Sequence, residues 1–284
     1  MIRLRMDLFA ESLQMGTSVV VLMPQAAAGI GMAGADDPGN GGPTEAPGVD
    51  DTPGKDRPGP AAADGERPGV PVLYLLHGLS DDCTIWERRT SIERYAGEKG
   101  IAVVMPEVRR SFYTDEAVGE KYWTWVADEL PQLIARTFRV STAREDTFVA
   151  GLSMGGFGAF KLALNRPGQF AAAASLSGVM DLAGLDLSEH AGSMARRIWD
   201  GRDIAGTEDD LLGLLRAAHP GHIPPLFLDC GTEDSLVDGN REFIALAGEC
   251  GHDLASRLRP GAHTWDFWDE GIRDVLDWLP TRAR

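Results

Sequence analysis

The sequence is poor in cysteine and has no long apolar run. Its 284 residues include only three cysteines, Cys83, Cys230 and Cys250, without the spacing of a metal site. An odd number so placed argues against a disulfide framework and favours a reducing compartment. No stretch approaches the roughly 20 apolar residues of a transmembrane helix, and the run at 19–23 is shorter than the roughly 7–15 residues of a signal-peptide core. These deficits predict a cytoplasmic protein that has no membrane partner.

Basic residues are also scarce relative to acidic ones. The chain has 27 Lys and Arg against 43 Asp and Glu, which gives a formal net charge of -16. Such a surface repels phosphate backbones and anionic membranes, so nucleic acid is excluded as an expected partner. The length allows one large α/β domain or two small ones, and it is sufficient for a sizeable core. Assembly into a homo-oligomer stays open.

One segment, residues 26–69, contains almost nothing that a core could bury. Its composition is dominated by Gly, Pro, Ala and Asp, which predicts a disordered surface insertion. Long surface loops cost little extra closure entropy, and this favours a tolerated insertion, with docking of a partner as the alternative. Before it, the segments 2–9 and 17–24 are β-branched or alternate apolar and charged residues, and they predict an antiparallel hairpin.

After residue 71, apolar strands alternate with helical patterns. We expect strands at 72–78, 101–106, 147–153, 170–178, 225–231 and 254–260, and helices at 91–99, 122–138, 155–167, 241–250 and 267–279. This alternation implies right-handed crossovers and a doubly wound, mostly parallel sheet with helices on both faces. The whole chain, 1–284, is therefore predicted to be one α/β domain. The polar stretch 181–221 is interpreted as a small cap or, alternatively, a surface helix pair.

A serine set among glycines lies between a predicted strand and a predicted helix. The stretch Gly151-Leu152-Ser153-Met154-Gly155 matches the G-x-S-x-G nucleophile elbow in the context that this motif requires. Small residues on both sides let the chain turn sharply and hold Ser153 in a strained conformation with its hydroxyl exposed. The alternative is a Gly-rich turn without chemistry. The context favours Ser153 as a catalytic nucleophile.

A serine hydroxyl needs a base to take its proton, and the base needs an acid to orient it. In this fold, both follow the serine in the chain. Asp234 comes directly after the predicted strand 225–231, and His263 follows the last strand on a glycine-containing loop. Glu233 is the nearest competitor for the acid. The remaining candidates are interpreted as structural or surface residues: Asp229, Asp238, His77, His190, His219, His222 and His252.

Acyl transfer also needs two N–H donors for the oxygen that becomes negative. Met154, directly after the nucleophile, is expected to supply one. The second is assigned to Leu79, in the loop after the strand 72–78, with His77 and Gly78 shaping the turn. His77 is predicted to be a structural imidazole that bonds neighbouring backbone.

The substrate pocket is harder to predict. Trp86 follows the oxyanion loop, so Trp86 and Gly78 are the candidate substrate-binding residues. Tyr122, Trp123 and Trp125 form a second aromatic group. At helical spacing, aromatic residues are more often part of the core than of an acyl site.

Several motifs together resemble the family described as "Putative esterase", which includes tributyrin, acetyl and feruloyl esterases and the esterase D type S-formylglutathione hydrolases. The motifs are LYLLHGLSDDCTIWERRTSIERYA, VVMPEVRRSFYTD, YWTWVADELPQLI, FVAGLSMGGFGAFKLAL, CGTEDSLVD and GAHTWDFWD. The resemblance implies an α/β-hydrolase fold and a cofactor-free Ser-Asp-His mechanism. It places the nucleophile on Ser153, the acid on Asp234, the base on His263 and the oxyanion donors on Leu79 and Met154.

The expected function is a serine carboxylesterase that acts on a small-molecule ester with a short acyl group, acetyl or butyryl. The alternatives are an S-formylglutathione hydrolase or an acyltransferase with the same triad, and a binding protein without turnover. Two departures from the resemblance bear on the substrate. The insertion 26–69 replaces a short connection, and Asp81-Asp82 stand where relatives often have Gly-Asn.

Overall fold

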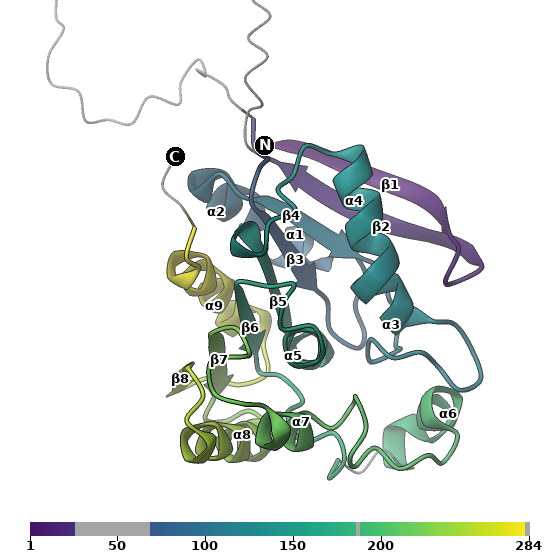
Figure 1. The fold of residues 1–284 in the computed structure, drawn as a ribbon, viewed down its shortest axis with the longest axis vertical. Helices are drawn as coiled ribbons and strands as arrows, with labels where there is room; N and C mark the ends of the chain where they lie inside the picture. Colours follow the sequence, from purple (N-terminus) through teal and green to yellow (C-terminus); the bar gives the residue numbers. More distant parts are fainter. Residues whose placement is uncertain (26–68, 186–187, 282–284) are drawn as a thin grey trace, which may run out of the picture. The chain divides into compact units, whose positions relative to one another are not determined.

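The computed structural model describes residues 1–25, 69–185 and 188–281, and a single eight-stranded sheet forms their centre (Figure 1). The strands are β1 (Ile2–Ala10), β2 (Met15–Met23), β3 (Val72–Leu76), β4 (Ala102–Pro106), β5 (Thr147–Leu152), β6 (Ala172–Leu176), β7 (Leu226–Gly231) and β8 (Leu254–Arg259). Their order is β1-β2-β4-β3-β5-β6-β7-β8. β2 pairs antiparallel with β1 and β4, and the other neighbours are parallel. The predicted parallel sheet with an antiparallel hairpin is confirmed.

The central strands are apolar without interruption because both of their faces are covered. In β3, Val72, Tyr74 and Leu76 contribute to one hydrophobic core, while Leu73 and Leu75 contribute to the other. Strands with helices on both faces lose the polar alternation of a half-exposed strand. The edge strand β1 keeps that alternation.

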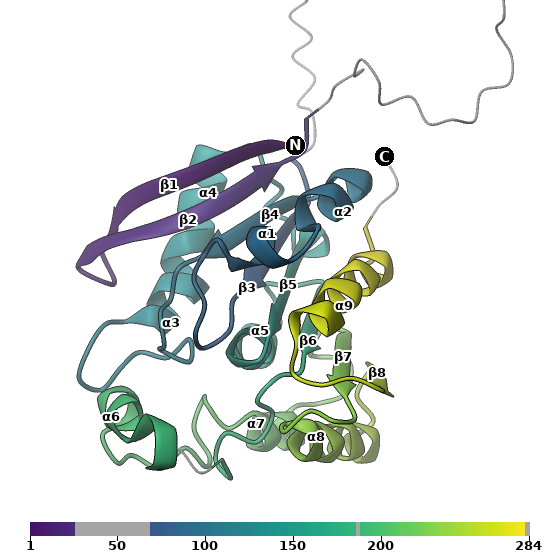
Figure 2. The same cartoon turned by 180° about the vertical axis from the view of Figure 1, so that it is seen from behind.

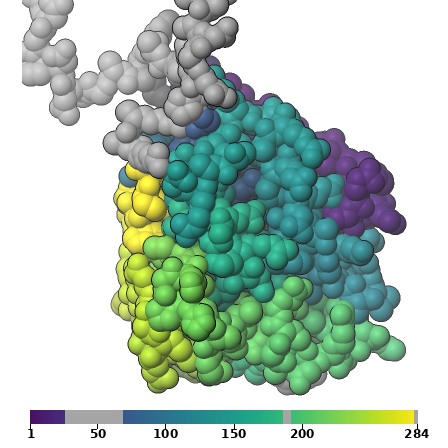
Figure 3. Space-filling view, viewed as in Figure 1, coloured from purple at the N-terminus to yellow at the C-terminus, as the bar shows by residue number. Residues whose placement is uncertain are grey.

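Helices form the layers on the two sides of the sheet. They are α1 (Ile85–Arg89), α2 (Ile92–Lys99), α3 (Tyr122–Thr124), α4 (Leu130–Thr137), α5 (Met154–Asn165), α6 (Ser188–Trp199), α7 (Leu211–Ala217), α8 (Val237–Cys250) and α9 (Trp265–Trp278), with a 3-10 turn at Arg144–Asp146. α1, α2 and α9 share one core and lie in front of the sheet in Figure 2. α3 to α8 contribute to the other core, on the face seen in Figure 1. In the space-filling view of Figure 3, their side chains close over that face of the sheet.

The predicted helix 122–138 is interrupted by a π-helical turn. α3 and α4 are joined by the π segment Trp125–Glu129, which ends just before Pro131. Proline has no N–H to donate and its ring clashes with the preceding turn, so the helix widens at this point. The one-turn helix α1 was not predicted, and α8 and α9 begin at Val237 and Trp265, earlier than expected.

Two predicted segments lie wholly or partly outside the described residues. The predicted insertion 26–69 lies outside the described residues except for Gly69. The stretch 181–221 contains α6 and α7, and the Ala117 N–H donates to the Ile198 carbonyl at 2.8 Å, which attaches the end of α6 to the loop after β4. Its role as a cap stays a prediction.

Among the described residues, no helix is both long enough and apolar enough to cross a membrane.

Candidate active site

Ser153 occupies a sharp turn between β5 and α5, as the glycine motif predicts. Its backbone angles are φ 52° and ψ -117°, a region that residues other than glycine rarely adopt. The Ser153 N–H donates to the Leu176 carbonyl at 2.9 Å, and its own carbonyl accepts from Phe157 N–H at 3.1 Å. The strained residue is therefore held between a neighbouring strand and the first turn of the helix.

The surrounding glycines are needed because backbone approaches them closely. A Cβ atom on Gly151 would overlap the carbonyl of Gly155, and one on Gly155 would overlap the carbonyl of Leu76 and lie 2.7 Å from that of His77. The glycines thus let α5 begin directly against the end of β3. This contact places α5, which begins directly after Ser153, beside the loop that follows β3.

Asp234 and His263, the predicted acid and base, lie within hydrogen-bonding distance of each other. The Asp234 carboxylate is buried, and its Oδ2 lies 2.8 Å from His263 Nδ1. Its Oδ1 accepts the Leu236 N–H at 2.9 Å. With Nδ1 donating to the carboxylate, His263 Nε2 has its lone pair free to accept a proton, which is the tautomer a general base requires.

The surroundings keep the Asp234 carboxyl ionised. Burial opposes the charged form, but hydrogen bonds from the His263 ring and the Leu236 N–H together outweigh it, so the pKa of Asp234 is lowered from its usual value. The Ser177 hydroxyl lowers this pKa further. An ionised carboxylate at this position meets the requirement for the acid of the predicted triad.

Sequence reasoning missed two residues behind this pair. The Trp268 ring meets the His263 ring edge to face, with centroids 4.7 Å apart, and the Trp268 Nε1–H donates to Ser177 Oγ at 3.2 Å. Ser177 follows β6 with a left-handed backbone, φ 49°. Trp268 therefore contacts His263 directly and reaches Asp234 through Ser177. The aromatic run after His263 was the available signal in the sequence.

The competing residues have other contacts. Glu233 is exposed and accepts hydrogen bonds from the Gly261 N–H and the Thr232 hydroxyl, so it joins two loops. His252 is buried, and its Nε2 is 2.9 Å from the Leu215 carbonyl. Neither contacts His263 in the hydrogen bonds of the described residues. His219 and His222 contact each other, 5.6 Å between ring centroids.

The loop after β3 lies next to Ser153. A Cβ on Gly78 would be 3.7 Å from Ser153 Cβ, so the chain passes close to the serine. The Leu79 and Met154 N–H groups take no part in the turn, loop and cap hydrogen bonds of the described residues. The His77 Nε2 accepts from Val108 N–H at 3.2 Å and its Nδ1 is 2.8 Å from the Gly78 carbonyl. His77 bonds neighbouring backbone, as predicted.

The structure does not place Trp86 in a substrate pocket. Its side chain is fully buried, the indole N–H donates to the Leu76 carbonyl at 3.1 Å, and its ring packs edge to face on Trp265. A side chain without exposed surface cannot line a pocket, so this expectation is corrected. Tyr122, Trp123 and Trp125 are likewise core residues.

A small cavity adjoins the candidate site. It measures about 130 Å³ and is lined by Val179, Met180, Asp181, Gly184, Leu185, Ser235, Leu236 and Gly239. The Val179 N–H lies 3.4 Å from the Ser153 backbone carbonyl, but Ser153 and His263 are not among the lining residues. A larger hollow of about 690 Å³, between the hairpin turn and α4, contains none of the site residues.

Comparisons with known proteins identify the family of the chain. The family model described as "Putative esterase" matches residues 62–279. An acetyl esterase of Caldicellulosiruptor saccharolyticus is 29% identical over 228 residues, which cover 76% of this chain and 85% of the relative. Two solved structures from Staphylococcus aureus cover 98% of both chains: the substrate-bound fluorophosphonate-binding serine hydrolase F, 29% identical with a TM-score of 0.79, and an S-formylglutathione hydrolase apoenzyme, 28% identical with a TM-score of 0.74.

The family match spans most of the chain, including the nucleophile elbow and the loops that carry Asp234 and His263. The chain therefore belongs to the "Putative esterase" family of α/β-hydrolases and is a serine carboxylic ester hydrolase.

Proposed function

We propose that this esterase hydrolyses short-chain acyl esters, of the acetyl and butyryl type, through an acyl-enzyme on Ser153. The observation that carries the proposal is the buried Asp234–His263 hydrogen bond, 2.8 Å long, in a chain whose Ser153 occupies a strained elbow. The acetyl esterase relative supports the acyl class.

In the proposed mechanism, Ser153 Oγ attacks the ester carbonyl while His263 Nε2 takes the hydroxyl proton. Asp234 orients the imidazole and stabilises its charge. The Leu79 and Met154 N–H groups donate to the carbonyl oxygen as it becomes negative. His263 then protonates the leaving alcohol, and water, deprotonated by the same histidine, releases the acid from the acyl-enzyme.

S-formylglutathione hydrolysis is the second candidate. The observation in its favour is the similarity to an S-formylglutathione hydrolase over 98% of both chains. A thioester passes through the same tetrahedral intermediate, so the triad and the oxyanion donors keep their roles. The two candidates differ only in the acyl donor that the site prefers.

The test is a series of p-nitrophenyl esters from acetate to octanoate, with S-formylglutathione measured in parallel and Ser153→Ala as the control. We expect kcat/KM to be highest at acetate or butyrate and turnover to vanish in the variant. A higher kcat/KM for S-formylglutathione than for every ester would replace the first candidate by the second. Turnover that persists in Ser153→Ala would contradict both.

Two further proposals concern the setting of the enzyme. A cytoplasmic location is supported by the three cysteines, all of which are free thiols. A cap role for 181–221 is supported by the cavity beside the site, since Asp181, Gly184 and Leu185 contribute to its lining.

A further inference from the structure

The loop that follows β4, residues 107–121, is here called the β4 loop, and it holds an unusual number of strained residues. Arg109, Phe112 and Tyr113 have left-handed backbones, with φ of 52°, 52° and 53°. Side chains other than glycine rarely adopt this region. Such strain persists only where the surroundings over-determine it, and it is concentrated at functional sites.

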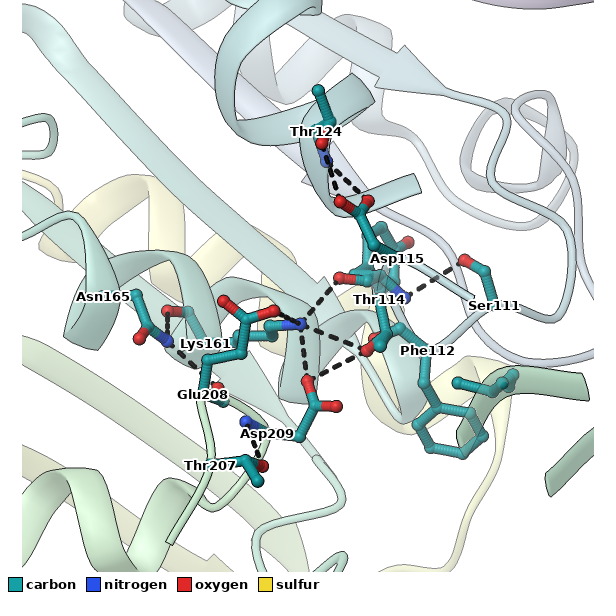
Figure 4. Close-up of polar contacts among 12 residues, drawn as sticks. Ser111, Phe112, Thr114, Asp115, Thr124, Lys161, Asn165, Thr207, Glu208 and Asp209 are labelled. Carbon is teal, nitrogen blue, oxygen red and sulfur yellow. Dashed lines mark hydrogen bonds and ion pairs between the residues drawn. The ribbon is translucent and has the colours of Figure 1, made fainter. Parts of the chain in front are cut away.

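Lys161, a residue of α5, forms hydrogen bonds to the β4 loop. It lies eight residues after Ser153 on α5 and is fully buried, and its Nζ donates to the Tyr113 carbonyl and to Thr114 Oγ1, both at 3.1 Å (Figure 4). The same ammonium group pairs with Asp209 Oδ1 at 2.5 Å. A buried cation is tolerated only with such partners. The proposed chemistry makes no use of Lys161.

Asp209 is itself fixed by further contacts. The Thr114 hydroxyl donates to its Oδ1 at 3.0 Å, and the Trp199 Nε1–H donates to its Oδ2 at 2.8 Å. The Trp123 ring lies 4.5 Å from Lys161 Nζ and covers the ammonium. With every group paired, the ammonium and the Tyr113 carbonyl that it binds have little freedom.

The Tyr113 side chain points from the β4 loop to the loop after β3. Its hydroxyl donates to the His77 carbonyl at 2.9 Å, and its ring lies against Gly158 of α5, where a Cβ atom would come within 2.6 Å of Tyr113 Cγ. Burial raises the pKa of Tyr113 well above its usual value. The hydroxyl therefore stays protonated and remains a donor.

The contacts of His77 decide where the Leu79 N–H points. His77 Nδ1 donates to the Gly78 carbonyl, which belongs to the same peptide plane as the Leu79 N–H. The peptide plane is rigid, so fixing that carbonyl fixes the direction of the N–H. The His77 ring and carbonyl are in turn held by Val108 and Tyr113, both from the β4 loop.

We propose that Tyr113, anchored by Lys161, is a positioning residue that sets the direction of the Leu79 N–H toward the reacting carbonyl. This inference rests on the proposed function, in which that N–H is an oxyanion donor. Preorganised donors act only when they are aimed at the oxygen of the transition state. A loosened β4 loop therefore reduces turnover while leaving substrate binding intact.

Tyr113→Phe tests this directly, because it removes only the hydroxyl that holds His77. Tyr95→Phe is the matched control, since the Tyr95 hydroxyl is also bonded, to Asp269 Oδ2 at 3.1 Å, away from this loop. With p-nitrophenyl acetate, we expect kcat to fall about tenfold in Tyr113→Phe with KM unchanged, a loss typical of a slightly misplaced group. A trifluoromethyl ketone, which mimics the tetrahedral intermediate, should lose affinity by the same factor.

The control variant should keep the wild-type kcat and inhibitor affinity. If Tyr113→Phe matches the control, or if its loss lies in KM alone, the positioning role is wrong. An inactive wild-type enzyme would instead overturn the proposed function. The two failures are therefore distinguishable.

A second variant tests the anchor. Lys161→Met combined with Asp209→Asn removes both charges, so that no unpaired charge is left buried. We expect the folded double variant, checked by its thermal midpoint and near-ultraviolet circular dichroism, to show the same fall in kcat. Adding Tyr113→Phe should then cause little further loss, because both changes act on one contact. A folded double variant with wild-type kcat would overturn the anchoring role of Lys161.

Discussion

Asp234 and Glu233 are neighbouring carboxylates after β7 whose positions in the structure differ completely. Asp234 is buried, and its carboxylate is hydrogen-bonded to the His263 ring. Glu233 is exposed, and its carboxylate accepts a hydrogen bond from the Gly261 N–H of another loop. From the sequence alone, the choice between them depends on the path of the turn after the strand. The backbone of that turn, in which the Asp234 N–H bonds the Gly231 carbonyl at 3.3 Å, decides which side chain faces the base.

Asp234→Asn is expected to reduce kcat by about 10⁴, because an amide in place of the carboxylate leaves His263 in the wrong tautomer. Steady-state hydrolysis of p-nitrophenyl acetate measures this. Glu233→Gln is the matched control, an acid-to-amide change one residue earlier, and should retain most of the wild-type rate. A greater loss in Glu233→Gln than in Asp234→Asn would reassign the acid.

The lowered pKa of Asp234 also predicts how stability depends on pH. Since the folded state favours the ionised carboxylate, its contribution is fully present above the pKa of an unfolded aspartate, about 3.9. The contribution is lost as the pH falls through the lower pKa of the folded state. Thermal midpoints of wild type and Asp234→Asn should therefore converge as the pH is lowered from neutral to about 3. A difference that stays constant would contradict the pKa direction.

At the level of elements, the regular apolar strands and the elbow could be predicted because local patterns determine them. The opening hairpin, the order of strands and helices and the strained Ser153 follow from periodicity and glycine placement. Trp86 could not be placed, since whether an aromatic residue lines a pocket or fills a core depends on Trp265, nearly 180 residues later. The Lys161–Asp209 pair depends in the same way on a long-range contact that no local pattern indicates.

Gly155→Ala tests the close packing of the elbow. The added Cβ would overlap the Leu76 carbonyl, so we expect a loss of about 1–3 kcal/mol in the free energy of unfolding, together with reduced activity. Gly168→Ala is the control, because a Cβ there has nothing within 4 Å. Urea denaturation of both variants measures the difference. Equal stability in the two would show that the elbow does not need glycine at 155.

For the whole molecule, the sheet determines what the chain between β2 and β3 must span. Leu22 of β2 and Leu73 of β3 both pair with Val103 of β4, one on each side. Neighbouring strands are about 4.8 Å apart, so these two points are separated by about 10 Å. A short linker can bridge this distance, although the natural connection is far longer.

Replacing residues 28–66 by a linker of about six Gly and Ser residues should therefore leave the fold intact. We expect an equal or slightly higher thermal midpoint, because a shorter loop has a smaller entropic cost of closure. We also expect unchanged hydrolysis of p-nitrophenyl acetate. Circular dichroism and the ester assay measure both. Loss of activity in a folded variant would show that the segment contributes to the site, contrary to its interpretation as a tolerated insertion.

The central claim, catalysis through a covalent intermediate on Ser153, is tested most directly by labelling the enzyme with a fluorophosphonate and locating the adduct by mass spectrometry. The account predicts one adduct per chain, on the peptide containing Ser153, with loss of esterase activity in proportion to labelling. Labelling should be slower when Asp234 or His263 is replaced. An adduct on another residue, or full ester turnover by a chain labelled at Ser153, would contradict it.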